Sequence, residues 1–375
     1  MRAIFISIII VVLVWWVWAQ TGYYSNQIKT HDQIEVMESI QLSDSTTKNI
    51  IGIQPFMTPQ DYLNEKAYYN KLDSYLNAAA QQGWINDHTT ILFPEYLGTW
   101  LAIVNEKTVT AETNRLNASM AYLLLSHPFD FMRQLSNHQG EQEWIAPTLF
   151  RMKAQEMTQA YQHVFRNLAS NYQVTIIGGS LVLPLSKIDD NQIVIDEKGM
   201  LYNSTFVFYP DGTIDPHVIR KVHPITAEQG FTAAIPTDEL PILELSTGKT
   251  AVLICADSWY PDTYQQIQRA SPEVLLVPSY CAGNGTMATL WKGYDGDAPP
   301  SDVDLSDIGS IQEKQAWIKY ALPGRINNSK MIGINVFLRG NLWDLGTDGD
   351  PFIVANDSLI TVQTTSKAGL WNINF

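Results

Sequence analysis

The sequence predicts an α/β fold in which strands and helices alternate along one large domain. Short apolar runs of strand length recur from residue 49 onward, and between them apolar residues return at the three- and four-residue steps of amphipathic helices. Such alternation is typical of helices packed in layers against sheets. A chain of 375 residues is long enough for a large core. We therefore expect one α/β domain with buried strands.

The first half of the domain is predicted to hold three strands and two helices. Asn49 to Gln54 is a short apolar run, and residues 72, 75, 76 and 79 then recur at helical spacing until Gly83. Residues 90–93 are the next strand. The clearest helix spans 150–168, where apolar residues return at alternating steps of three and four. A strand at 174–177 follows it.

The second half is predicted to begin with a hairpin. Residues 204–209 are rich in strand-forming types, and 210–213 (Pro-Asp-Gly-Thr) has the residues of a tight turn. The return strand leads to Lys221. Further apolar runs continue the core at 251–254, 274–277 and 331–336.

Two stretches interrupt this pattern and are interpreted as insertions, near 100–145 and 282–309. The first contains the apolar runs 120–125 and 129–132, and the second is rich in Gly and Asp. One interpretation is that both only elaborate the surface. The other is that the first insertion covers a pocket or rests on a membrane, because long ordered loops are often functional.

The N-terminus has a different character from the domain. Ala3 to Ala19 is apolar and uncharged, at the short end of a membrane span, and Arg2 precedes it. Val17-Trp-Ala19 also fits a signal-peptidase site. Residues 1–20 are therefore predicted to be a transmembrane anchor or a cleaved signal segment. The polar residues 21–48 are predicted to be a tether to the domain at 49–375.

Either alternative for the N-terminus places the domain on the non-cytoplasmic side of a membrane. The protein is then membrane-anchored through its N-terminal segment or secreted, and it is periplasmic if the source is bacterial.

Charge and cysteine content exclude several classes of protein. The net charge of −14 disfavours a nucleic-acid partner, since phosphate binding needs a basic face. Two cysteines, Cys255 and Cys281, exclude a disulfide-rich scaffold. We expect both thiols to be free and Cys281 to be a buried structural residue. No strong zinc spacing or phosphate loop is present, so no metal or organic cofactor is expected.

Three polar residues of complementary chemistry each follow a strand-like run. They are Glu95, Lys221 and Cys255. The carboxyl ends of strands are where α/β folds build their sites. A thiol is mostly protonated near neutral pH, a neighbouring cation lowers its pKa, and a carboxylate can remove its proton. The carboxylate can then protonate a leaving nitrogen. The three residues therefore indicate covalent acyl chemistry.

These three segments, in this order, resemble the nitrilase (carbon–nitrogen hydrolase) superfamily from residue 49 to the end of the chain. The resemblance implies an α-β-β-α sandwich. It also implies Glu95 as general base and acid, Lys221 as oxyanion stabiliser and Cys255 as nucleophile. The backbone N–H of Ala256 would be the second oxyanion donor. Glu228 resembles the second glutamate of the family, which orients the triad and the substrate, although an exposed loop carboxylate is the alternative.

The residues after the nucleophile resemble the amidase-like members of the family. Cys255 and Asp257 match their Cys-x-Asp pattern, and the Cys-Trp-Glu of family nitrilases is absent. Asp257 is expected to hold the turn, and His223 to make structural hydrogen bonds rather than act as a base. The aromatic residues Trp259, Tyr260 and Tyr280 are predicted to line the substrate pocket, with ordinary aromatic packing as the alternative.

The sequence thus predicts a hydrolase that cleaves a linear, non-peptide amide C–N bond of a small molecule through a covalent acyl-enzyme. The alternatives are an N-acyltransferase that uses the same acyl-enzyme, a nitrilase, and a non-catalytic binding protein that keeps the fold. Family members commonly assemble through the sandwich face, so the resemblance also implies a homo-oligomer.

Overall fold

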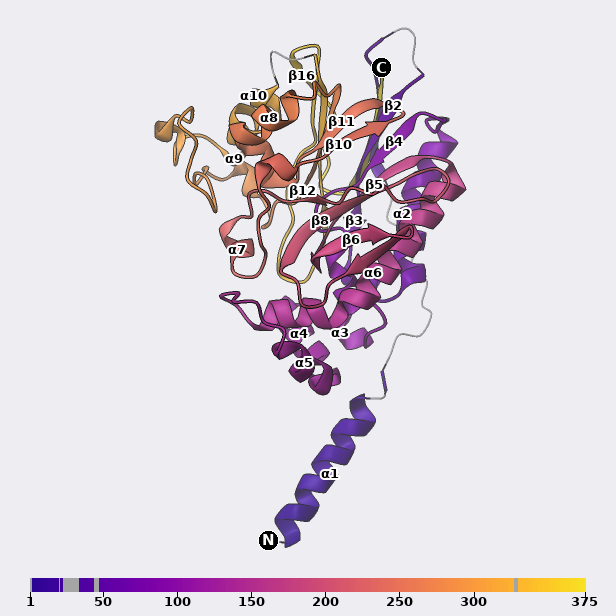
Figure 1. Ribbon diagram of the computed structural model, residues 1–375, viewed down its shortest axis with the longest axis vertical. Helices are drawn as coiled ribbons and strands as arrows, with labels where there is room; N and C mark the ends of the chain where they lie inside the picture. Colours follow the sequence, from indigo (N-terminus) through magenta and orange to yellow (C-terminus); the bar gives the residue numbers. More distant parts are fainter. Residues whose placement is uncertain (1, 20, 23–33, 44–46, 327–329) are drawn as a thin grey trace.

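Two β-sheets stack face to face between two layers of helices. The structure is a computed structural model, and it describes residues 2–19, 21–22, 34–43, 47–326 and 330–375. In Figure 1, helices α2 and α6 lie on one side of the strands, and α8, α9 and α10 lie on the other. The predicted α-β-β-α sandwich is confirmed.

The first sheet has seven strands in the order β1-β17-β2-β4-β5-β8-β9. Strands β2, β4 and β5 run parallel, whereas β8 is antiparallel to both β5 and β9. Strands β4 and β9 therefore end at the same edge. The bounds are β1 (Ile34–Gln41), β2 (Asn49–Gln54), β4 (Thr89–Leu92), β5 (Thr175–Pro184), β8 (Leu201–Phe208), β9 (Ile219–Arg220) and β17 (Ala368–Asn374).

Two long helices cover the outer face of this sheet. They are α2 (Glu65–Gln81) and α6 (Ile145–Tyr172). Helix α2 begins where the Asn64 side chain accepts a hydrogen bond from the backbone N of Ala67 at 2.7 Å, which satisfies one of the free donors of the first turn. Helix α6 ends at Gln173, which adopts a left-handed conformation.

The second sheet has six strands in the order β10-β11-β12-β13-β15-β16. Its bounds are β10 (Ile242–Leu245), β11 (Gly248–Val252), β12 (Val274–Ser279), β13 (Ile332–Phe337), β15 (Phe352–Ala355) and β16 (Ser358–Ile360). The helices on its outer side are α8 (Pro261–Gln268), α9 (Glu313–Tyr320) and α10 (Leu322–Arg325). Two small pairings complete the strands, β3 (Phe56–Met57) with β14 (Arg339–Gly340), and β6 (Ser186–Asp189) with β7 (Gln192–Ile195).

The two insertions differ in structure. The first folds into short helices, which are η2 (Thr99–Ile103), α3 (Thr108–Glu112), α4 (Leu116–Ser126) and α5 (Pro128–Leu135). The second has only the short turns η5 (Thr286–Ala288) and η6 (Leu305–Asp307). The remaining single turns are η1 (Pro59–Tyr62), α7 (Thr226–Gln229), η3 (Thr237–Glu239) and η4 (Cys255–Trp259).

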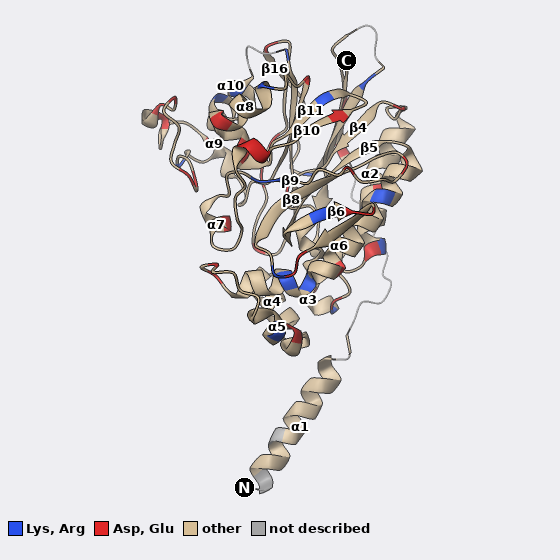
Figure 2. Cartoon of the chain, in the orientation of Figure 1, with Lys and Arg blue, Asp and Glu red and all other residues tan. Residues whose placement is uncertain are grey.

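Helix α1 (Arg2–Ala19) extends away from the body of the molecule (Figures 1 and 2). Lys107 Nζ donates to the carbonyl oxygens of Trp18 at 2.8 Å and Ala19 at 2.9 Å, so a cation caps the end of the helix. In the part of the chain that the structure describes, no helix has both the length and the apolar character that crossing a membrane requires. The predicted transmembrane anchor is therefore not supported, and the signal segment that was its alternative stays a prediction.

Several boundaries and strands differ from the sequence-based expectation. Residues 34–41, predicted as part of the tether, form β1, which pairs in parallel with β17. Strand β1 was missed because it is mostly half-exposed or exposed and has no apolar run of the kind that marks a buried strand. Strand β17 itself was not predicted. Helix α6 begins five residues before the predicted 150.

The facing sheets approach closely at Gly52 of β2. A Cβ atom at this position would lie 2.4 Å from Ile334 Cδ1 and 2.7 Å from Val336 Cγ1, both on β13. Real side chains do not come so close, so the contact between the sheets requires a residue without a side chain here. The glycine thus sets the spacing of the sandwich.

We expect Gly52→Ala to lower the free energy of unfolding by about 1–3 kcal/mol, because the added methyl group overpacks the core. Ile334→Val removes the nearer atom, Cδ1. The double variant should therefore be more stable than the sum of the two single changes predicts. Thermal or denaturant unfolding of the four proteins measures this coupling, and strictly additive losses would contradict the account.

Candidate active site

The three predicted site residues follow strands of both sheets. Glu95 lies three residues after the end of β4, and Lys221 directly follows β9. Cys255 lies three residues after β11 of the second sheet and begins η4. Because β4 and β9 end at the same edge, their following residues come together, and the second sheet supplies the thiol from across the interface.

Lys221 lies between two carboxylates. Its Nζ donates to Glu95 Oε1 at 2.8 Å and to Glu228 Oε2 at 2.6 Å. Each of the three side chains is at most 2% exposed. Glu228 is thus buried, unlike an exposed loop carboxylate. Two carboxylates and one ammonium leave one negative charge without a partner in a buried site, and such a charge is costly to bury.

The two glutamates respond differently to this environment. Burial raises the pKa of Glu95 above its ordinary 4.5, and the charge on Glu228 adds to that rise although Lys221 opposes it. Burial also tends to raise the pKa of Glu228. Lys221 and a hydrogen bond from Tyr96 outweigh burial there, so the pKa of Glu228 is lowered. Of the two carboxyl groups, Glu95 therefore has the higher proton affinity.

The pKa of the Cys255 thiol is raised by its surroundings. Burial raises its pKa well above 9.0, and the Glu95 carboxylate adds to the rise, while Lys221 only partly opposes it. The nearby cation does lower the thiol pKa, as expected, but desolvation is larger, so the net pKa is raised. The Cys255 side chain interacts with the Glu95 carboxylate and, at 3.6 Å, with the carbonyl oxygen of Tyr280.

The backbone at the thiol is held by Asp257. Cys255 has a φ of 49°, a left-handed conformation that costs a non-glycine residue about 1–2 kcal/mol. Asp257 Oδ2 accepts from the N of Ile254 at 3.2 Å, and its Oδ1 accepts from the N of Val222 at 3.0 Å and of His223 at 2.7 Å. The buried carboxyl therefore joins the turn of the thiol to the residues directly after Lys221, as predicted for Asp257.

Two further residues contact the carboxylates and were not predicted. Asn203 Nδ2, on β8, donates to Glu95 Oε1 at 2.8 Å and to Glu228 Oε1 at 2.9 Å. The hydroxyl of Tyr96 donates to Glu228 Oε1. The opposite amide orientation of Asn203 would place its oxygen against two carboxylates, so the donor orientation is the consistent one. The sequence signal for Asn203 was a polar residue within the strand 201–208, which is almost wholly buried.

The aromatic residues predicted for the substrate pocket lie in different environments. Tyr280 donates its backbone N to Glu95 Oε2 at 3.0 Å, and its ring lies 5.6 Å from that of Tyr96. Trp259 packs edge-on against Trp317 at 4.9 Å. Tyr260 stacks on His223 at 3.9 Å. Tyr280 alone among the three contacts the buried carboxylates, and a pocket role for all three stays a prediction.

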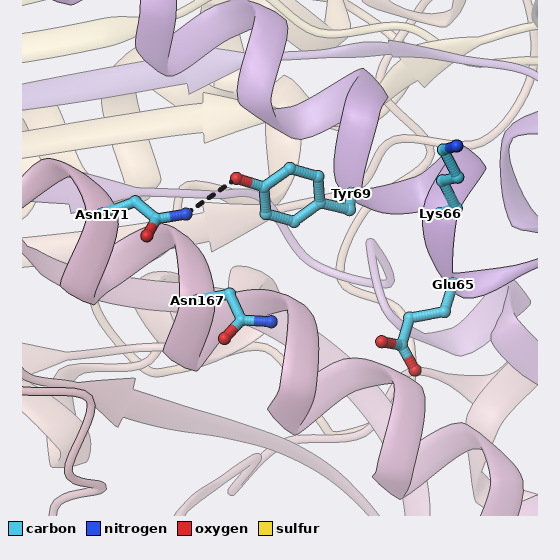
Figure 3. Close-up of a pocket in the computed structure, with 5 residues that line it drawn as sticks. All are labelled: Glu65, Lys66, Tyr69, Asn167 and Asn171. Carbon is cyan, nitrogen blue, oxygen red and sulfur yellow. Dashed lines mark hydrogen bonds between the residues drawn. The ribbon is translucent and has the colours of Figure 1, made fainter.

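Other candidate features lie outside this site. Both cysteines are free, as predicted, and burial raises the pKa of Cys281 to about 12. Figure 3 shows a pocket at the surface between α2 and α6, where Asn171 Nδ2 donates to the hydroxyl of Tyr69 at 2.9 Å. None of the predicted site residues lines it. Ala256 follows the thiol as the second residue of η4, and its role as an oxyanion donor stays a prediction.

Solved structures share this fold. An amidase from Nesterenkonia sp. AN1, with the acetamide moiety of fluoroacetamide bound covalently at its active-site cysteine, aligns with a TM-score of 0.53 over 89% of this chain and 92% of that chain, at 13% identity. Another structure of an amidase from Nesterenkonia sp. aligns with a TM-score of 0.52 over 88% and 90%, at 14% identity. At such identities the likeness shows the fold alone.

Sequence comparisons identify the family. A protein from Bacillus subtilis (strain 168) named as the probable hydrolase YhcX is 27% identical over 214 residues, which are 48% of this chain and 39% of that protein. The chain thus spans about two fifths of the length of this relative. Residues 52–293 match the carbon-nitrogen hydrolase family, which is more than half of the chain and includes all four of the residues Glu95, Lys221, Glu228 and Cys255. The chain belongs to the carbon-nitrogen hydrolase family.

Proposed function

We propose that this hydrolase cleaves a linear, non-peptide amide C–N bond of a small molecule through an acyl-enzyme on Cys255. The observation that carries the proposal is the buried ammonium of Lys221 between Glu95 and Glu228, beside a thiol that interacts with Glu95. Amide hydrolysis by this route needs a nucleophile, a proton carrier and a cation close together, and Cys255, Glu95 and Lys221 would supply them.

The first half of the reaction forms a thioester. Glu95 takes the thiol proton as sulfur attacks the amide carbon, because a buried thiol with a raised pKa supplies little thiolate by itself. The carbonyl oxygen becomes an oxyanion. An ammonium has three hydrogens, and the contacts with Glu95 and Glu228 use two of them. The third hydrogen of Lys221 and the N–H of Ala256 bind the oxyanion, each worth roughly 3–4 kcal/mol of barrier lowering.

The second half releases the acid. Glu95 delivers its proton to the nitrogen as the C–N bond breaks, so the product leaves as neutral ammonia or amine. A water molecule then attacks the thioester. Glu95 takes one proton from this water and returns it to sulfur, which restores the thiol. A raised pKa suits both directions of transfer, because it brings the carboxyl closer to neutral pH.

Removing the nucleophile tests the proposal directly. Cys255→Ala should lower ammonia release from a panel of small amides by about 10⁴-fold or more, as the loss of a nucleophile does in other triad enzymes. Cys281→Ala is the matched control, since it removes the other buried thiol outside the site. Mass spectrometry should find the acyl group on Cys255. Equal ammonia release from wild type and Cys255→Ala would refute the proposal, and amide products after addition of an amine would indicate acyl transfer instead.

Asn203 is expected to set the acid limb of the pH profile. The limb of kcat/KM that reports Glu95 should lie above pH 4.5, because burial raises the pKa of this base. A donor to a carboxylate favours its charged form, so Asn203→Leu should move the limb to higher pH. A hydrogen bond to a charged group contributes about 1.5–3 kcal/mol, which corresponds to about 1–2 pH units.

A second buried asparagine provides the control for this shift. Asn335 Nδ2 also makes two hydrogen bonds, to the carbonyl oxygen of Val277 and to Ser279 Oγ, each at 2.7 Å. Asn335→Leu should lower stability by a similar amount and leave the limb where it is. If both variants reduce kcat/KM equally at every pH, Asn203 has only a structural role.

A separate proposal concerns location. We propose that residues 1–20 direct export and that the domain acts outside the cytoplasm, in the periplasm if the source is bacterial. The support is the uncharged segment Ala3 to Ala19 behind Arg2. A fusion of residues 1–48 to alkaline phosphatase, which is active only after export, should give activity in bacterial cells, and deletion of residues 3–19 should abolish it. A fusion that stays inactive would contradict export.

A further inference from the structure

Glu228 is carried by a segment that has little stability of its own. Helix α7 is a single turn of four residues, and short isolated helices are not stable in water. Thr226, Ala227 and Gln229 are exposed, whereas Glu228 is 2% exposed and points into the site. Contacts from outside the segment must therefore hold this carboxylate against Lys221.

The second insertion supplies contacts at the start of the segment. Asp297 Oδ2 lies 2.7 Å from His223 Nδ1, and Asp295 Oδ1 accepts from the backbone N of Thr226 at 3.3 Å. Gly296, between these aspartates, packs directly on the backbone. A Cβ on Gly296 would lie 2.5 Å from the carbonyl oxygen of Pro224. We call residues 295–297 the acidic tip.

The first insertion supplies a contact at the other end of the segment. The backbone N of Glu143 donates to the carbonyl oxygen of Gly230 at 3.0 Å. Phe231 stacks on Phe150, near the start of α6, with ring centroids 5.9 Å apart. The two insertions thus contact both ends of the segment 223–230, which carries Glu228, although they lie about 150 residues apart in the sequence.

We propose that the acidic tip is a positioning element, which fixes residues 223–230 so that Glu228 stays bound to Lys221. This inference rests on the proposed function for its effect on the reaction. The hydrogen bonds of the acidic tip go to His223 and Thr226, not to the thiol or the ammonium. The tip therefore acts through residues 223–230. A glycine at 296 is required because any side chain would push the tip away from Pro224 and Ile225.

Two glycines of the same insertion give a matched pair of variants. Gly296 has a φ of 101° and Gly293 has a φ of 95°, so alanine strains the backbone similarly at both. A Cβ at 293 would meet only the flexible side chain of Ile308, at 3.1 Å or more, whereas a Cβ at 296 meets the backbone of the Glu228 segment. The two changes therefore differ in whether they displace the acidic tip.

The experiment measures hydrogen–deuterium exchange and amide hydrolysis for wild type, Gly296→Ala and Gly293→Ala in the full chain. Exchange of residues 223–230 should rise in Gly296→Ala alone. Its kcat/KM should fall about ten- to a hundredfold, since displacing a reacting group by ~1 Å costs about a hundredfold. Asp295→Ala, with the exposed Asp304→Ala as its control, repeats the comparison with variants that remove hydrogen bonds of a surface carboxylate.

The outcomes separate this inference from the proposed function. Equal exchange in the two glycine variants, or raised exchange without any loss of activity in Gly296→Ala, would overturn the positioning role. If even wild type hydrolyses no amide, the proposed function fails. Exchange at 223–230 then still decides whether the acidic tip holds the segment.

Discussion

The site depends on one buried ammonium that binds two carboxylates. A cation between two anions in a buried site cannot neutralise both, and an uncompensated charge there costs several kcal/mol. The four donors on Glu228, which are Tyr96, Asn203, Lys221 and the N of Ile225, stabilise its charge. Glu95 adjoins the thiol and keeps the higher proton affinity. The two identical side chains thus differ because Lys221 and the hydrogen bonds outweigh burial at Glu228, whereas burial and the charge on Glu228 prevail at Glu95.

The fold supports this site at some cost to the backbone. Tyr96 and Cys255 both adopt left-handed conformations, with φ of 61° and 49°, and each costs about 1–2 kcal/mol. Ser180 Oγ accepts from the N of Tyr96 at 2.9 Å, and Asp257 braces the turn at Cys255. Buried hydrogen bonds therefore hold the strained backbone at Tyr96 and Cys255, where the Glu95 carboxylate and the Cys255 thiol come together. The two insertions extend this support to Glu228.

Local patterns in the sequence predicted the strands and helices whose formation depends on neighbouring residues. The apolar run at 49–54 and the helical face of 150–168 gave correct elements, and the strand ends located Glu95, Lys221 and Cys255. Strand β17 was missed because its place between β1 and β2 depends on pairing across the whole chain. Asn203 and Tyr96 were missed because their partners are distant in sequence, and the rise in the thiol pKa depends on burial, which spacing does not show.

The most direct test is the protonation of the two glutamates. Difference infrared spectra of the carboxyl stretch, wild type minus Glu95→Gln and wild type minus Glu228→Gln, report each group separately across pH. The account predicts a protonated carboxyl band that persists above pH 4.5 and disappears in Glu95→Gln, while Glu228 stays ionised over the same range. Two glutamates that titrate together at their ordinary value would contradict it.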